Sequence, residues 1–437
     1  MNRRILHLAI PSIVSNITVP LLGLVDVTIV GHLGATAYIG AIAVGGLLFN
    51  ILYWNFGFLR MGTSGLTSQA YGRKDKEAEI RVLVQAVSVG LFSALAMLIL
   101  QYPIELLAFR LLDTSAEVEQ YAVTYFRICI WGAPAVLAQY SFTGWFIGMQ
   151  NSRYPMYIAI VMNVINIVCS SCFVFLFKMK VEGVALGTVV AQYSGVMMAL
   201  GFWYYNYKEL RGRITFKGSL QLIAMRRFFA VNRDIFLRTL CLIGVTTFFT
   251  STGARQGDVI LAVNTLLMQL FTLFSYIMDG FAYAGEALSG RYVGACNLVQ
   301  LKRAVKALFC WGVVLSLVFT LLYGIGGENF LGLLTNDTVV IETAGRYFYW
   351  VLAIPLAGFA AFLWDGILIG ATATRFMLWA MLVASGSFFV IYYCFSGATN
   401  NHTLWLAFLV YLALRGIMQT IWSRRVFTLK YLQSLRS

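Results

Sequence analysis

The chain alternates long runs of hydrophobic residues with short polar segments. Twelve of these runs have roughly the 20 residues that a helix needs to cross the hydrocarbon core of a bilayer. We therefore predict an all-α polytopic membrane protein with twelve transmembrane helices. The predicted helices cover residues 8–31, 35–59, 82–102, 121–148, 157–178, 181–206, 235–253, 258–283, 304–325, 345–371, 376–396 and 402–423.

Polar residues are most concentrated in the middle of the chain. The longest polar stretch, 207–234, predicts a basic cytoplasmic linker with six helices on either side of it. The predicted domains are thus an N-terminal six-helix lobe, 1–206, and a C-terminal six-helix lobe, 235–437. Because each lobe holds an even number of helices, both enter the membrane from the same side. Two such bundles with a cavity between them suit transport by alternating access.

Two glycine motifs occur in both halves at the same spacing. Gly144-Trp-Phe-Ile-Gly148 ends the fourth predicted helix, and Gly366-Ile-Leu-Ile-Gly370 ends the tenth, 222 residues later (366 − 144). Gln69-Ala-Tyr-Gly72 and Arg291-Tyr-Val-Gly294 are also 222 residues apart (294 − 72). The shared offset indicates a parallel internal repeat. Glycines spaced by four residues also let neighbouring helices approach closely.

Composition and charge agree with a membrane protein. The chain is 60% hydrophobic and only 11% charged, whereas a soluble domain is about 25% charged. This excludes a soluble enzyme, a nucleic-acid-binding module and a disordered protein. With the N-terminus inside, 26 of the 32 Lys and Arg residues fall on the cytoplasmic side, including the 208–238 region and the tail from Arg415. The net charge of +14 is therefore explained by the positive-inside rule, with both termini cytoplasmic and no nucleic-acid partner.

Four acidic residues lie within or just after the predicted helices: Asp26, Asp279, Glu286 and Asp365. An ionisable group inside a bilayer costs at least about 2.5–3.5 kcal/mol. Each carboxylate therefore needs a partner, a water-filled cavity or a proton. This requirement makes the four residues the main candidates for function.

Asp26 is the strongest of these candidates. No Lys or Arg occurs between Arg4 and Arg60, so neither its own helix nor the next offers a basic partner. A carboxyl group in that position suits the gain and loss of a proton during transport. Pro11 lies on the same helix, as does Pro20, and could let the helix kink. A carboxylate that only packs against polar neighbours is the alternative interpretation.

Polar residues of the fifth and sixth predicted helices lie at about the depth of Asp26. Asn166 and Ser170 are one turn apart on the fifth helix, and Thr188 lies on the sixth. Together with Asp26 they could form a proton relay or a cation-coordinating site. Asn163 precedes them on the same helix. Taken singly, Asn and Ser residues also serve as ordinary contacts between transmembrane helices.

The acidic residues of the second half are harder to interpret. Asp279 and Glu286 are two turns apart on one helix face, and Arg291 could neutralise Glu286. We expect them to form a gating or structural network. Asp365 directly precedes Gly366, and the sequence leaves its structural and functional interpretations equally open.

Several segments together resemble the multidrug and toxic compound extrusion (MATE) family, and the second half resembles its DinF-like branch. The resemblance spans nearly the whole chain. It implies two six-helix lobes, a central cleft, and export of amphipathic, often cationic compounds driven by proton or sodium entry. The matching segments are Ile10-Pro11, Asp26-Val-Thr-Ile-Val-Gly31-His-Leu-Gly34, Gly132-Ala-Pro134, Gly144-Trp-Phe-Ile-Gly148-Met-Gln-Asn, Asn163-Val-Ile-Asn166, Asp279-Gly-Phe-Ala-Tyr-Ala-Gly-Glu286-Ala and Asp365-Gly-Ile-Leu-Ile-Gly-Ala371-Thr.

The resemblance also implies roles for individual residues. Asp26 matches the aspartate of the first helix, whose protonation is coupled to bending at the proline matched by Pro11. Asn166 and Thr188 match polar members of a cation site. This chain has Ser170 where relatives often carry a second aspartate. That departure favours proton coupling over a weak sodium site at Asp26, Asn166 and Thr188, and no cofactor or resident metal is expected.

Three other function classes were weighed against an exporter. A lipid-linked oligosaccharide flippase should carry several cationic residues inside its spans, and the predicted helices contain almost none. A membrane-embedded enzyme would need a reactive cluster, but His7, His32 and His402 all lie near helix ends. An ion channel would need a selectivity filter or a symmetric oligomer. We therefore expect a monomeric transporter in a bacterial inner membrane, in contact with lipids and small amphipathic or cationic substrates.

Overall fold

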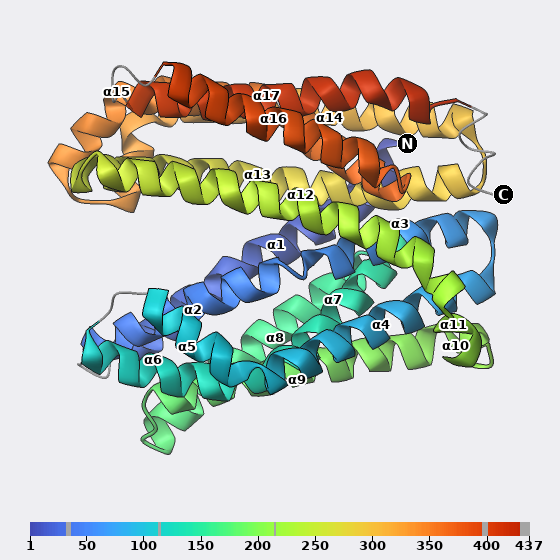
Figure 1. The fold of residues 1–437 in the computed structure, drawn as a ribbon, viewed down its shortest axis with the longest axis horizontal. Helices are drawn as coiled ribbons and strands as arrows, with labels where there is room; N and C mark the ends of the chain where they lie inside the picture. Colours follow the sequence, from blue (N-terminus) through green and yellow to red (C-terminus); the bar gives the residue numbers. More distant parts are fainter. Residues whose placement is uncertain (32–35, 112–114, 214–215, 396–400, 429–437) are drawn as a thin grey trace. The chain divides into compact units, whose positions relative to one another are not determined.

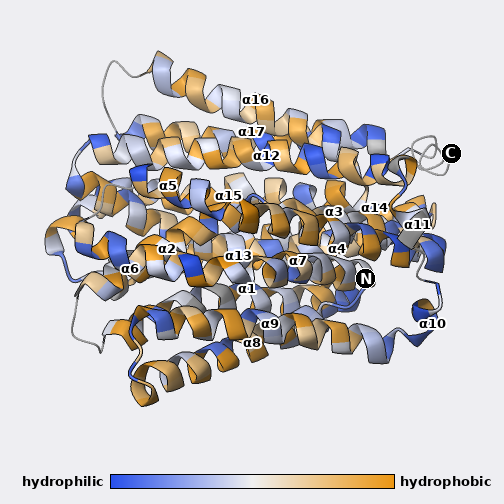
Figure 2. Cartoon of the chain, turned by 60° about the horizontal axis from the view of Figure 1, so that its bottom comes forward, coloured by the Kyte–Doolittle hydropathy of each residue, from blue (hydrophilic) through white to orange (hydrophobic). Residues whose placement is uncertain are grey.

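The computed structural model describes residues 1–31, 36–111, 115–213, 216–395 and 401–428, almost all of them helical (Figure 1). Twelve helical segments in these residues are long and apolar enough to cross a membrane, which confirms the predicted number. Figure 2 shows that the long helices are mainly hydrophobic along their length. Many large hydrophobic side chains, such as Phe92 and Ile325, are exposed, as expected where lipid covers them.

The chain forms two compact units, and the first of them in sequence is unit 2, Val14–Asn232. It begins within helix α1, which runs without interruption through Pro11 and Pro20. The elements that contribute to unit 2 are α1 (Asn2–Gly31), α2 (Thr36–Trp54), α3 (Gly57–Arg73), α4 (Lys76–Ile99), α5 (Gln101–Leu111), α6 (Ala116–Cys129), the 3₁₀ turn η1 (Ile130–Gly132), α7 (Ala133–Gly148), α8 (Arg153–Ser171), the π-helical turn η2 (Cys172–Leu176), α9 (Val181–Asn206), α10 (Lys208–Arg211), α11 (Phe216–Ser219) and the start of α12 (Leu222–Arg255).

Unit 1 consists of Met1–Ile13 and Arg233–Ser437. It contains the first part of α1 and the larger part of α12. Helix α14 is kinked at Gly327, where a φ of 35° suits a residue without a side chain. The remaining helices of unit 1 are α13 (Asp258–Gly294), α14 (Leu298–Leu334), α15 (Thr338–Gly370), α16 (Thr374–Cys394) and α17 (Asn401–Val426).

The units differ from the predicted lobes in two places. The predicted linker, 207–234, contains the short helices α10 and α11, but α12 already begins at Leu222. Hydropathy locates the apolar part of a helix, and it does not detect a charged first turn such as the one that holds Arg226 and Arg227. Residues 1–13 belong to unit 1 and not to the half in which they stand in the sequence.

The predicted internal repeat is visible in the way glycines pack. A Cβ atom on Gly144 of α7 would lie 2.2 Å from the carbonyl oxygen of Arg60 on α3. A Cβ atom on Gly366 of α15 would lie 2.1 Å from the carbonyl oxygen of Ala282 on α13. Both partners shift by the same 222 residues (366 − 144 and 282 − 60). The two units therefore repeat one helix–helix contact, and glycine is needed in both.

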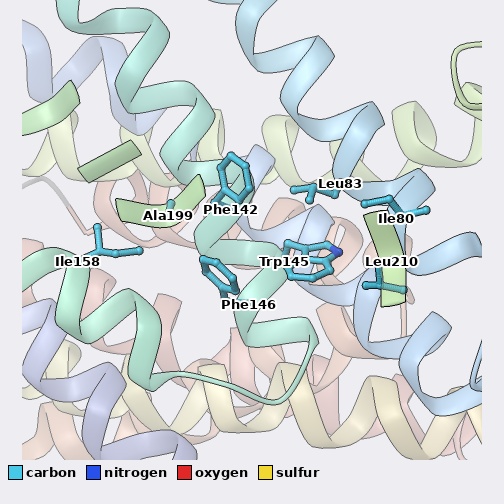
Figure 3. Packing of buried hydrophobic residues seen from close by; sticks show 8 residues of the cluster. All are labelled: Ile80, Leu83, Phe142, Trp145, Phe146, Ile158, Ala199 and Leu210. Carbon is cyan, nitrogen blue, oxygen red and sulfur yellow. The ribbon is translucent and has the colours of Figure 1, made fainter. Parts of the chain in front are cut away.

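Unit 2 contains a tightly packed hydrophobic cluster near α10 (Figure 3). The Trp145 side chain is fully buried, and its Nε1 donates a hydrogen bond to the Glu79 carbonyl oxygen over 2.8 Å. This contact joins α7 to the start of α4. The cluster consists of Ile80, Leu83, Phe142, Trp145, Phe146, Ile158, Ala199 and Leu210.

Candidate functional site

Three helices of unit 2 bring together the polar residues that the sequence singled out. Asp26 lies on α1, Asn166 and Ser170 on α8, and Thr188 on α9. The Nδ2 of Asn166 donates a hydrogen bond to Thr188 Oγ1 over 3.0 Å. The Asp26 carboxyl group is in hydrogen-bonding contact with the side chains of both Thr188 and Asn166. Residues from three separate helices thus meet as the sequence predicted; we call them the Asp26 site.

Helix α9 also holds Ser170 in place. A Cβ atom on Gly187, next to Thr188, would lie only 2.2 Å from Ser170 Oγ. The absence of a side chain at Gly187 therefore lets α8 approach α9 at this level. Ser170 faces α9 one turn beyond Asn166, and a π-helical turn follows it from Cys172 onward. Such turns are frequent at functional sites.

The Asp26 site is closed to solvent and short of hydrogen-bond donors. Asp26 is 4% exposed and Asn166 and Ser170 are fully buried. Asp26 Oδ1, Asn166 Oδ1 and Ser170 Oγ are buried oxygen atoms that have no hydrogen-bond partner within the described part of the chain. Buried polar atoms are normally paired. Three unpaired oxygens in one place therefore indicate a site that accepts a proton or a small cation.

Two residues of α6 belong to the site but were not predicted. Tyr125 and Cys129 are one turn apart and buried. Tyr125 is in side-chain contact with Cys129 and Thr188 and lies near Asp26. Its ring occupies space beside Gly45, where a Cβ atom would be 2.4 Å from Cδ1 of the tyrosine. In the sequence, a tyrosine within an apolar run is indistinguishable from a packing residue.

Asn163 and Pro11 lie outside this group. Asn163 Nδ2 donates to the carbonyl oxygen of Thr18 over 2.9 Å and so ties α8 to α1. Pro11 belongs to the part of α1 in unit 1, whereas Asp26 belongs to unit 2. Helix α1 is thus the element that carries both residues, and the bending role of Pro11 stays a prediction.

Asp365 has basic partners that the sequence analysis placed elsewhere. Its Oδ2 accepts from Arg238 of α12 and, over 2.7 Å, from Arg415 of α17. Its Oδ1 accepts from Gln419 Nε2 over 2.6 Å. Both arginines are buried within membrane-length helices. Assigning Arg238 to a cytoplasmic linker region and Arg415 to a cytoplasmic tail was therefore wrong, because the runs that contain them are helical on either side.

The other two carboxylates lie on α13. Glu286 is buried, and Gly370 of α15 packs against its backbone, so that a Cβ atom on this glycine would be 2.3 Å from the Glu286 carbonyl oxygen. Asp279 is half-buried and lies near Tyr276. Their predicted gating or structural role stays a prediction.

Histidine and metal chemistry give no second site in the described residues. His402 Nδ1 accepts a hydrogen bond from Trp350 Nε1 over 3.1 Å and contacts Tyr349 Oη at 2.8 Å. His32 lies outside the described residues. A search of the described residues finds no group of three or more His, Cys, Asp or Glu side chains that could hold a metal ion.

Comparisons with known proteins agree with this architecture. The MatE family model matches residues 11–171 and 235–394, one range in each half of the chain. DNA damage-inducible protein F of Escherichia coli K12 is 39% identical over 96% of this chain and 91% of its own length. Probable multidrug resistance protein NorM of Thermotoga maritima is 23% identical over 78% of this chain and 74% of its own length.

Solved structures share the fold at low sequence identity. A crystal structure of a MATE protein in the bent conformation superposes with a TM-score of 0.86, covering 98% of this chain and 96% of that one at 18% identity. The eukaryotic MATE transporter AtDTX14 gives a TM-score of 0.85, covering 100% of this chain and 98% of that one at 16% identity. The twelve-helix architecture is thus shared across both structures.

Proposed function

The chain belongs to the MatE family, and from that premise we propose that it exports amphipathic compounds in exchange for protons that bind at Asp26. Membership makes it a multi-pass membrane transporter and not an enzyme. A relative named as a multidrug resistance protein supports a range of drug-like cargo. We place it as a monomer in a bacterial inner membrane with both termini in the cytoplasm, following its basic residues.

The observation that carries proton coupling is the shortage of donors at Asp26. Thr188 Oγ1 donates to the Val184 carbonyl oxygen over 3.0 Å, so it can only accept from Asn166. Asp26 Oδ1 and Asn166 Oδ1 are then two buried acceptors with no donor among the described residues. An ionised carboxylate only accepts, whereas a protonated one has an O–H to donate. A proton on Asp26 therefore supplies the hydrogen-bond donor that the site lacks.

Sodium fits the same site less well. A hard cation is held by several oxygen ligands and by negative charge. Asp26 is the one carboxylate of the Asp26 site, because Ser170 supplies a neutral hydroxyl. Sodium at Asp26, Asn166 and Thr188 is the alternative within this family.

Helix α1 provides the path from proton to conformational change. It contributes Met1–Ile13 to unit 1 and Val14–Gly31 to unit 2. Protonation of Asp26 removes a buried charge from one part of the helix. The other part, which contains Pro11, is fixed to a different unit. Bending at Pro11 would then change how the two units are joined during alternating access.

Vesicles with imposed ion gradients test the proposal. We expect efflux of a fluorescent cationic amphiphile from proteoliposomes when only a proton gradient is present, and none with a sodium gradient. Efflux with sodium alone would overturn proton coupling and assign sodium to Asp26, Asn166 and Thr188. No efflux under either gradient, with folded protein, would favour the lipid-linked oligosaccharide flippase.

Ser170→Asp is expected to introduce sodium dependence. The substitution adds a second carboxylate one turn from Asn166 and opposite α9. The matched control is Ser170→Asn, which fills the same space beside Gly187 without adding charge. Transport is measured at a fixed proton gradient with increasing sodium. If the Asp and Asn variants keep the ion preference of the unmodified protein, Ser170 does not determine the coupling ion.

A further inference from the structure

Unit 1 contains a second buried polar cluster that the proton-coupling mechanism does not use. We call Arg238, Asp365, Arg415 and Gln419 the arginine cluster. They come from α12, α15 and α17, and each is at most 6% exposed. Both arginines contact the same carboxylate oxygen, Asp365 Oδ2, and Gln419 contacts the other. The cluster is therefore organised around one acid.

The charges of the arginine cluster do not balance. Two guanidinium groups share one carboxylate, which leaves one positive charge inside the unit. The interactions of Arg415 are with Asp365 and with Tyr411, and Tyr411 Oη itself donates to Met381 Sδ over 3.1 Å. Arg415 also lies 5.7 Å from the centroid of the Phe362 ring. Aromatic faces attract a cation without neutralising it, so the surplus charge persists.

Hydrogen-bond donors are in surplus as well. The Nε atoms of Arg238 and Arg415 are both buried without a hydrogen-bond partner in the described ranges. Arginine N–H groups can only donate and stay charged at any physiological pH. Both side chains are more than nine-tenths buried, so water at the surface of the unit does not satisfy them. The arginine cluster lacks one negative charge and at least two acceptor atoms.

We propose that the arginine cluster binds the carboxylate group of a transported amphiphile. A carboxylate supplies one negative charge and two acceptor oxygens, and it matches the planar donor pattern of arginine. Phe362 and Tyr411 offer apolar surface beside the charge for the rest of such a molecule. The inference rests on the proposed export function and extends the expected cargo from cationic to carboxylate-bearing compounds.

Asp365 is an internal competitor in this arrangement. Its carboxylate occupies the donors that a cargo carboxylate would use, so it keeps the arginines paired in the closed unit. Removing its charge should strengthen binding of an external carboxylate, whereas removing an arginine should weaken it. A purely structural ion cluster makes the opposite prediction for Asp365: its loss would destabilise the protein and create no affinity for anions.

Thermal stabilisation of the purified full-length chain in detergent tests the proposal. The probes are benzoate, its neutral amide benzamide, the cation benzylammonium, and chloride, all at equal concentration. A ligand that binds only the folded state raises the melting temperature. We expect benzoate alone to raise it by a few degrees. Arg415→Gln should abolish the shift, and Asp365→Asn should enlarge it.

The matched control is Arg127→Gln in unit 2, which removes an exposed arginine paired with Glu105. It should leave the benzoate response unchanged. If Arg415→Gln does not fold, Arg238→Lys keeps the charge but loses the planar donors, and it should weaken the response several-fold. Asp365→Asn keeps both arginines and tests the competitor role directly.

Three outcomes would overturn the proposal. An equal shift with benzamide would mean that only the apolar ring binds. An equal shift with chloride would assign the site to a small inorganic anion. No response to benzoate in either the unmodified protein or Asp365→Asn would remove the site altogether. The assay uses no ion gradient, so its failure is distinct from a failure of proton-driven export.

Discussion

Export driven by a proton gradient is expected to disappear when Asp26 is replaced by Asn. The amide has the same shape as the carboxyl group and keeps polar contact with Asn166 and Thr188. It cannot gain or lose a proton, so the coupling step is removed while the packing is kept. Efflux from proteoliposomes should fall to the level of protein-free vesicles.

The matched control for Asp26 is Asp75→Asn. Asp75 caps α4 by accepting from the Ala78 amide over 3.0 Å, and Asn caps a helix about as well. This variant should keep both its stability and its export. A folded Asp26→Asn protein that exports at the original rate would remove Asp26 from the mechanism, whatever its surroundings.

Gly366→Ala is expected to disrupt the second unit. The new Cβ atom would lie 2.1 Å from the Ala282 carbonyl oxygen and 2.8 Å from its Cα atom. These are backbone atoms, so no rotamer change relieves the clash, and α13 must move away from α15. Overpacking of this kind costs typically about 1–3 kcal/mol and occasionally more, so we expect a fall in melting temperature of roughly 5–10 °C.

Gly386→Ala is the control for this effect. It lies in α16, and a Cβ atom there would meet nothing within 4 Å. Alanine favours a helix by up to about 1 kcal/mol over glycine, so its melting temperature should stay level or rise slightly. Equal melting of the Gly366 and Gly386 variants would mean that close approach does not explain the glycine at 366.

The sequence predicted features that depend on local pattern or on one repeated spacing. Twelve spans follow from hydropathy alone, and the repeat follows from the shared glycine offset. The Asp26 site was also predictable, because an unpaired acid in an apolar run points to polar residues at its own depth. Asn166 and Thr188 are such residues, and the structure places them against Asp26.

Long-range pairing could not be predicted in the same way. Arg238 and Asp365 are 127 residues apart in the sequence, and Arg238 follows a run of charged residues that resembles a loop. Only the assembled helices show that its side chain points into unit 1. The same holds for Tyr125, whose place beside the Asp26 site depends on the packing of α6 against α9. The flippase was disfavoured because the predicted spans held few cations, and the structure corrects that premise with two arginines.

The repeated glycine contact has a consequence for the ancestry of the chain. Gly144 and Gly366 occupy equivalent places, yet Thr143 precedes the first and Asp365 the second. If an ancestral gene for six helices was duplicated, the glycines were retained while the neighbouring residue diverged from neutral to acidic. Selection then acted separately on helix packing and on charge. The two halves could therefore specialise, one around a single acid and the other around paired arginines, without rebuilding their common frame.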